Sequence, residues 1–130
     1  MFRDKRTCEA EFFAADIFAD GGRLGELEGG LDVVYAGAFF HLFDLPEQEQ
    51  IAERVAGLLK AETGVMMLGR NVDGGSYTTT SGGRFVQHDK QSWQALWKEV
   101  GRATGSQWDV WVEEREVEGV RQMCFCVTRK

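Results

Sequence analysis

The chain has 130 residues, of which 43% are hydrophobic and 28% charged, with a single proline. This composition predicts one globular domain over residues 1–130 and excludes a disordered chain, a collagen-like repeat and a disulfide-rich miniprotein. The formal net charge of -6 argues against nucleic-acid binding, because no surplus of Lys and Arg is available to neutralise phosphates. No signal peptide or membrane-length apolar run is recognisable, so we expect a cytoplasmic protein without a membrane partner.

Three cysteines form an odd set without a C-x-x-C spacing, which argues against a disulfide framework or a zinc site. No His/Glu spacing on a predicted helix indicates another metal site either. Cys124 and Cys126 alternate on a predicted strand, so we expect both thiols on one face and buried.

The first half of the chain predicts strands around one long helix. Residues 11–18, "EFFAADIF", predict a first strand or strand end, and the glycine-rich residues 19–30 a connection with one short helical turn. Residues 31–40, "LDVVYAGAFF", have the β-branched composition of a central parallel strand buried on both faces. Residues 45–64 predict a helix with Pro46 in its first turn, an apolar stripe and a stop at Gly64.

The second half predicts a strand, a loop, a helix and a terminal hairpin. "VMML" is typical of a buried strand, and the following "GRNVDGGSYTTTSGG" of a polar loop. Residues 89–105 predict a second amphipathic helix that ends at Gly105. Residues 108–117 and 121–130 alternate in polarity on either side of Glu118 and Gly119, which indicates an antiparallel hairpin.

Strands that alternate with helices indicate the α/β class. Right-handed crossovers make the expected sheet mostly parallel, with a C-terminal antiparallel hairpin and helices packed on the sheet.

Several segments resemble the C-terminal half of the class I S-adenosylmethionine (SAM)-dependent methyltransferases. "AADIF", "LDVVYAGAFFHLFD" and "LLKAETGVMMLGR" are similar to successive segments of that fold, from about Phe12 onward. The blocks "FFHLFD" and "HDKQSWQALWKEVGRATGSQW" are similar to fungal methyltransferases of terpenoid and polyketide pathways. The resemblance implies a truncated Rossmann-like methyltransferase sheet.

The glycine-rich, SAM-binding N-terminal half of that family has no counterpart here. No G-x-G-x-x-G motif or equivalent occurs, and the glycine doublets do not lie between a strand and a helix start. On the family's pattern only Asp16 remains of the cofactor site, as a vestigial adenine contact. We therefore expect no cofactor, with SAM binding only if the missing half is supplied.

In that family a strand of the N-terminal half pairs with the strand that "DVVYAGAFF" resembles. Because this chain lacks a counterpart of that strand, the edge of "DVVYAGAFF" is open. An open apolar edge needs a cover, which residues 11–18, a second copy of the chain or a separate chain could provide. We favour a homodimer through this edge.

Four residues are candidates for acid/base chemistry. His41 leaves the carboxyl end of the central strand, where open α/β sheets bind ligands, and it is either a general base or acid or a cap of the next turn through Asp44. His88 precedes the second helix, and is either the second member of an acid/base pair or a surface residue at the helix entry. Tyr35 and Arg70 could support them, Arg70 by holding an oxyanion, although an ion pair explains Arg70 equally well.

Aromatic side chains offer a pocket for an apolar small molecule. Stripes of this kind usually form a core instead, and Tyr77 belongs to a polar loop. The candidate substrate-binding residues are Phe39, Phe40, Phe43, Tyr77, Trp93 and Trp97.

The sequence leads to a SAM-independent enzyme as the first hypothesis. Acid/base cyclisation, isomerisation or dehydration of a terpenoid or polyketide intermediate needs only an apolar pocket and proton-transfer groups. The alternatives are a non-catalytic methyltransferase-like protein that binds a partner, and one half of a SAM-dependent methyltransferase.

Overall fold

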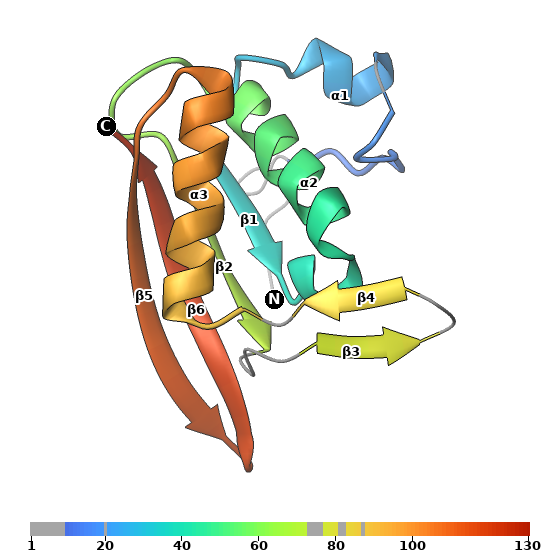
Figure 1. The fold of residues 1–130 in the computed structure, drawn as a ribbon. Helices are drawn as coiled ribbons and strands as arrows, with labels where there is room; N and C mark the ends of the chain where they lie inside the picture. The colour runs from blue at the N-terminus through green and yellow to red at the C-terminus, as the bar shows by residue number, and fades with distance from the viewer. Residues whose placement is uncertain (1–9, 20, 73–76, 81–82, 87) are drawn as a thin grey trace, which may run out of the picture.

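Four strands form one sheet in the order β1-β2-β6-β5 (Figure 1). The structure, a computed structural model, describes residues 10–19, 21–72, 77–80, 83–86 and 88–130, with the backbone alone for residues 72, 77–80 and 83–86. The strands of the sheet are β1 (Val33–Gly37), β2 (Met66–Val72), β5 (Trp108–Val117) and β6 (Val120–Arg129).

The sheet is mixed. β1 and β2 pair in parallel, whereas β2 with β6 and β6 with β5 pair antiparallel. The α/β class and the terminal hairpin are confirmed, but the sheet is less parallel than expected, because the hairpin's second strand inserts beside β2. The single parallel pair is connected through a helix, as a parallel crossover requires.

Helix α2 (Leu45–Leu58) begins at an aspartate cap and ends earlier than expected. The Asp44 carboxylate accepts a hydrogen bond from the Glu47 amide at 2.9 Å, and Pro46 lies in the first turn. The helix stops at Leu58 rather than Gly64, because the extended Leu59 pairs with Leu31 in a parallel bridge just before β1.

Helix α3 (Lys90–Thr104) has both expected ends. Asp89 and Ser92 form a capping box, and Gly105 closes the helix in a left-handed conformation with φ of 70°. A β-carbon would be strained at that φ, which explains glycine at the stop signal.

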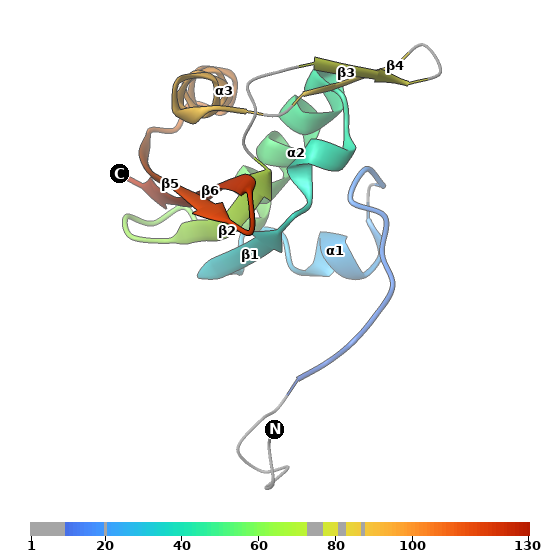
Figure 2. The ribbon, with the colours of Figure 1, turned by 90° about the horizontal axis from the view of Figure 1, so that it is seen from below.

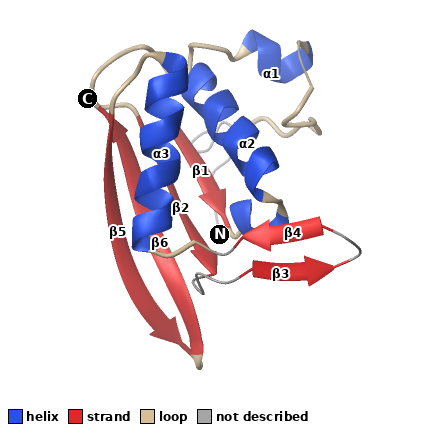
Figure 3. Ribbon diagram, viewed as in Figure 1, coloured by secondary structure: helices blue, strands red, loops and turns tan. Residues whose placement is uncertain are grey.

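Two expectations about the remaining segments are wrong. Residues 11–18 form no strand, and end in a turn before the short helix α1 (Gly22–Glu26). The expected loop over residues 69–83 instead continues β2 to Val72 and forms β3 (Tyr77–Thr80), which pairs with β4 (Gly83–Val86) in a separate hairpin (Figure 3). Threonines favour strands, and their cross-strand pairing outweighs the turn signal of the flanking glycines.

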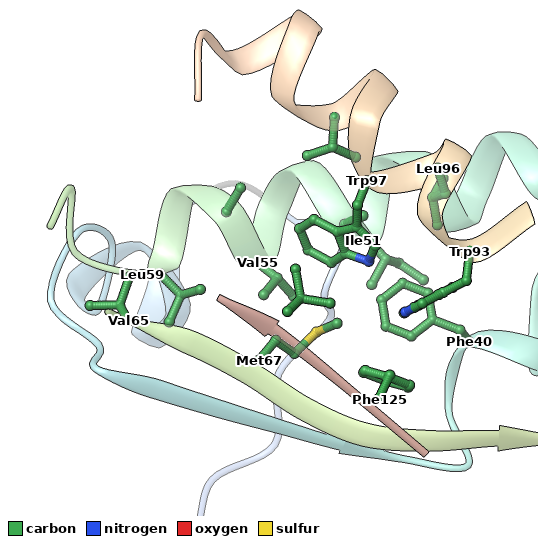
Figure 4. Close-up of a cluster of buried hydrophobic side chains, with 14 of the residues drawn as sticks. Phe40, Ile51, Val55, Leu59, Val65, Met67, Trp93, Leu96, Trp97 and Phe125 are labelled. Carbon is green, nitrogen blue, oxygen red and sulfur yellow. The ribbon is translucent and has the colours of Figure 1, made fainter. Parts of the chain in front are cut away.

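The core lies between the sheet and one layer of helices. Figure 2 shows α2 and α3 on the same face of the sheet, and Figure 4 shows the side chains packed between them. The Trp93 ring contacts Phe40 at 5.0 Å and Phe125 at 4.6 Å between ring centroids. The fully buried side chains of this core include Phe40, Ile51, Leu59, Met67, Trp93, Trp97, Met123 and Val127.

The opposite face of the sheet is largely open. Val33 and Tyr35 of β1 are 52% and 70% exposed, so the expectation that this strand is buried on both faces is wrong for the chain alone. Cys124 and Cys126 share this face, as their spacing predicts, but they are half-buried instead of buried.

Among the described helices, none combines the length and the apolar character that crossing a membrane requires.

Candidate functional site

The carboxyl ends of β1 and β2 meet at one edge of the sheet, because the two strands are parallel. The 3-10 helix η2 (Phe40–Leu42) follows β1 at this edge and contains His41. The position agrees with the rule that places ligands outside the carboxyl ends of parallel strands.

His41 has an unused ring nitrogen. Its Nδ1 atom is buried and has no hydrogen-bond partner, and burial lowers the pKa of the imidazole below its ordinary value. The ring is therefore neutral near pH 7, with a buried Nδ1 that has no hydrogen-bond partner. The alternative interpretation makes His41 a cap of the next turn. In the structure Asp44 caps that turn, because its carboxylate accepts a hydrogen bond from the first turn of α2.

His88 holds the two long helices together. Its Nε2 lies 2.5 Å from the Gln48 side-chain oxygen on α2, and its Nδ1 lies 2.9 Å from the Ser92 hydroxyl on α3. The Gln48 amide nitrogen donates to the Phe43 carbonyl, which leaves the Gln48 oxygen to accept. His88 therefore carries its proton on Nε2, and its Nδ1 shares the Ser92 hydroxyl with the Asp89 carbonyl, which lies 3.2 Å from the same Oγ.

Burial controls the charge of His88. The residue is 3% exposed, so it is not the surface residue that the alternative interpretation assumes. Desolvation lowers the pKa of the imidazole to about 4. The side chain borders a shallow cavity of about 230 Å³ between α2 and α3, whose lining does not include His41. The structure thus gives the two histidines separate surroundings, and an acid/base pair remains only a prediction.

Tyr35 and Arg70 lie on the open face of the sheet. Gly37 pairs with Arg70 across β1 and β2, and the Tyr35 ring leans over Gly37, where its hydroxyl is 3.1 Å from the position that a β-carbon would take. Both side chains are exposed, and no ion pair joins Arg70 to another described residue. They need a cover over this face before they can act on a substrate.

The candidate aromatic residues divide among different surroundings. Phe39 and Phe40 line an apolar cavity of about 300 Å³ beside β1, together with Ile17, Tyr35 and Val55. Phe43 contacts Phe39 at 5.0 Å and Phe18 at 5.6 Å between ring centroids. Trp93 and Trp97 are wholly buried core residues, and Tyr77 lies in β3, where the backbone alone is described.

Asp16 is the one described residue that the resemblance places at a SAM site. Its carboxylate accepts a hydrogen bond from the Phe18 amide at 2.9 Å and stabilises the turn before α1. One carboxylate beside an apolar cavity does not hold a nucleoside and an amino-acid group, so the described residues do not fit SAM on their own. Within the same residues, no group of three or more potential ligands is arranged for a metal ion.

Sequence reasoning missed two buried polar residues, Gln48 and Asn71. Gln48 is the partner of His88, and Asn71 has neither side-chain polar atom hydrogen-bonded. The spacing of both residues in the sequence indicates that they are buried. Gln48 falls three residues before Ile51, on the apolar stripe of α2, and Asn71 continues the alternation by which Met67 and Gly69 face the core.

The outer edge of β1 has no strand beside it in the described part of the chain. The Asp32 carbonyl accepts from the Met66 amide at 3.0 Å, and the Ala38 amide donates to the Arg70 carbonyl at 2.8 Å. Parallel ladders alternate along a strand, so the even-numbered residues of β1 bind β2 and the odd-numbered ones direct their amides and carbonyls outward. Within the described residues no strand pairs with these outward groups, and the edge lies next to the 300 Å³ cavity.

Fungal methyltransferases are similar to this chain over most of its length. It is 39% identical over 122 residues to the O-methyltransferase phiE of Fungal sp. (strain ATCC 74256), which covers 89% of the chain and 40% of phiE. It is 35% identical over 144 aligned residues to the O-methyltransferase atr3 of Stereocaulon alpinum, which covers 99% of the chain and 42% of atr3. The chain thus spans less than half the length of these curated relatives. It matches no protein-family model.

A solved structure shows the same fold. An O-methyltransferase family protein from Burkholderia thailandensis superposes on 92% of the chain with a TM-score of 0.56 and 19% identity, over 35% of its own length. The strand order and the terminal hairpin agree with the expected C-terminal half of such a domain. The chain is therefore a methyltransferase-like protein, related to the fungal O-methyltransferases and corresponding to the C-terminal half of a class I methyltransferase domain.

Proposed function

We propose that the chain forms the acceptor side of a methyltransferase site in natural-product biosynthesis, and that a further polypeptide segment pairing with β1 completes the site. The observation that carries the proposal is the open edge of β1, which lies beside an apolar cavity at the ligand-binding end of the sheet. An extended segment can satisfy such an edge by adding one strand to the sheet.

The cofactor side requires that second segment. The curated relatives are more than twice as long as the part that this chain matches. SAM, the cofactor that the resemblance implies, would supply the methyl group when bound. Among the described residues, the resemblance assigns only Asp16 to this side. Backbone donors for the cofactor must come from the completing segment, because leaving its polar groups desolvated and unpaired costs several kcal/mol.

On the acceptor side, His41 has the properties of a general base. Methylation of a hydroxyl oxygen releases the hydroxyl proton, and a neutral imidazole with a free nitrogen can take it up. The unpartnered Nδ1 of His41 at the carboxyl end of β1 supports this role. The His88 imidazole is engaged on both nitrogens, which favours His41 over His88.

The same free nitrogen supports a second candidate function, the SAM-independent acid/base reaction. Cyclisation or isomerisation of an apolar intermediate also uses one proton-transfer group beside an apolar cavity. The two functions differ in their requirement for SAM. Methyl transfer needs both SAM and the second segment, whereas the acid/base reaction proceeds without SAM.

Calorimetric titration with SAM tests the proposal. The chain alone is titrated first, followed by the chain mixed with the part of phiE that it does not match. We expect no measurable binding to the chain alone and binding to the mixture. Micromolar binding to the chain alone contradicts the proposal, and so does a stable mixed complex that binds no SAM.

A further inference from the structure

A row of apolar side chains crosses the open face of the sheet from one edge strand to the other. The strand registers align Tyr35 of β1 with Leu68 of β2. Leu68 in turn lies opposite Cys126 of β6, and Cys126 lies opposite Trp111 of β5. Residues directly opposite each other in a ladder point to the same face. Tyr35 is 70% exposed and Trp111 55%, so both aromatic ends of the row stand in solvent.

A second apolar pair lies beside this row. Val33 of β1 is opposite Met66 of β2, and the Met66 sulfur lies 3.9 Å from the Cys126 thiol. Exposed charged residues border the apolar side chains, with Asp109 on one side and Arg70 on the other. An apolar centre inside a charged rim is typical of an interaction surface. We call the six apolar residues the open-face patch: Val33, Tyr35, Met66, Leu68, Trp111 and Cys126.

The crossover between β1 and β2 indicates what covers the patch. From β1 to the parallel β2 the chain passes through α2, on the face that both long helices cover, in the right-handed sense (Figures 1 and 2). A segment that adds a parallel strand outside β1 and then continues outward runs the opposite way along the sheet. The same handedness places its next crossover on the opposite face. The open face is therefore the place for a helix of the completing segment.

The relative phiE has enough additional chain for such a helix. The match covers 40% of phiE, so more than half of that protein lies outside it. A strand beside β1 has only five residues to pair with, which leaves most of the additional chain for other elements. Parallel strands are usually connected through a helix, so the additional chain is expected to contain one.

We propose that the open-face patch is the docking surface for an amphipathic helix of the segment that completes the site, with Tyr35 and Trp111 as its anchors. Exposed aromatic side chains contribute strongly to binding when an interface buries them, and the polar side of the helix stays in water. The inference rests on the proposed completion of the site, but it concerns a different surface. Trp111 belongs to the opposite edge strand, three strand spacings or about 14 Å from β1.

Trp111→Lys tests the docking surface, with Val117→Lys as the matched control. Val117 is an exposed apolar residue of the same strand, but it pairs with Val120 beside the hairpin turn and lies outside the patch. Calorimetric titration measures the affinity of each variant for the part of phiE that the chain does not match. We expect Trp111→Lys to weaken binding about tenfold or more and the control to bind as the wild type does. Equal affinities of the two variants overturn the proposal.

Labelling of Cys126 with N-ethylmaleimide, mapped by mass spectrometry, supplies an independent test. The thiol should react in the chain alone and be protected in the complex. Amide exchange along β1 is followed in the same samples, which separates this inference from the proposed function. Protected β1 amides with an unchanged Cys126 rate overturn the docking surface alone, whereas a protected Cys126 without protected β1 amides overturns the strand addition alone. Absence of a complex overturns both, and protection of Cys126 in the concentrated chain alone assigns the patch to a second copy and overturns the inference.

Discussion

His88 illustrates how a residue suited to catalysis can be used for packing. Its spacing before an amphipathic helix fits both a catalytic role and a helix entry, and only the position of Gln48, 40 residues earlier, shows what it binds. Long-range pairs of this kind are not visible in one sequence. The local contacts were more predictable, because Asp89 and Ser92 follow a capping pattern.

The lowered pKa of His88 predicts that acid destabilises the fold. In the unfolded chain the imidazole takes up a proton near pH 6.5, but in the folded chain only near pH 4, so the unfolded state gains protons as the pH falls between these values. The contribution of the neutral His88 imidazole to the free energy of unfolding is complete above pH 6.5. It is lost as the pH falls toward 4, by about 3 kcal/mol at most.

Urea denaturation between pH 4 and 7 checks this prediction. His88→Gln keeps a donor for Gln48 but does not titrate, so its stability should fall less on acidification than that of the wild type. His41→Gln is the control, because the smaller burial of His41 makes its contribution smaller. Equal acid sensitivity in His88→Gln and the wild type would show that His88 is not buried as described.

At the scale of elements, the two long helices and the terminal hairpin could be predicted, whereas the end of α2 and the conformation of residues 11–18 could not. The stripe of Trp93 and Trp97 and the stop at Gly105 are local signals. By contrast, α2 ends at Leu58 because Leu59 pairs with Leu31, and residues 11–18 are apolar yet find no partner strand. Strand formation depends on neighbours that the local sequence does not encode.

Close packing of β1 against β2 predicts that Gly69 tolerates no side chain. A β-carbon there would lie 2.1 Å from the Ala36 carbonyl oxygen and 2.7 Å from the Phe125 ring. Gly69→Ala must move the β1 backbone, which we expect to cost about 2–3 kcal/mol of unfolding free energy in chemical denaturation.

Gly57→Ala is the matched control in helix α2. Its β-carbon meets only the flexible Glu28 carboxylate at 3.6 Å, and alanine has a higher helix propensity than glycine. We expect about 0.5–1 kcal/mol of added stability. If Gly69→Ala were as stable as Gly57→Ala, the described contact between β1 and β2 would be wrong.

On the scale of the whole molecule, the resemblance to methyltransferases located the open edge before the structure did. The absence of a glycine-rich turn implied a missing neighbour for the strand with Tyr35, and β1 is the edge strand of the described sheet. The candidate site was less predictable. His41 lies at the expected edge, but Asn71 was overlooked because an unsatisfied amide becomes visible only once the packing around it is known.

The outer edge of β1 has two candidate partners, and their binding depends differently on the concentration of this chain. A homodimer, the sequence-based expectation, requires only more of the same chain, whereas the half-site requires a different segment. We propose the different segment, because the outer edge of β1 and the cavity beside it are uncovered in the described chain, and phiE is more than twice as long as the part that matches.

Amide hydrogen exchange along β1 tests this central claim most directly. In the dilute chain the outward amides of Val33, Tyr35 and Gly37 should exchange fast, and those of Val34 and Ala36, bonded to β2, slowly. Adding the part of phiE that the chain does not match should protect the three outward amides and leave exchange at the outer edge of β5 unchanged. If these amides gain no protection in a stable complex, or become protected in the concentrated chain alone, the proposed completion of the site at β1 is contradicted.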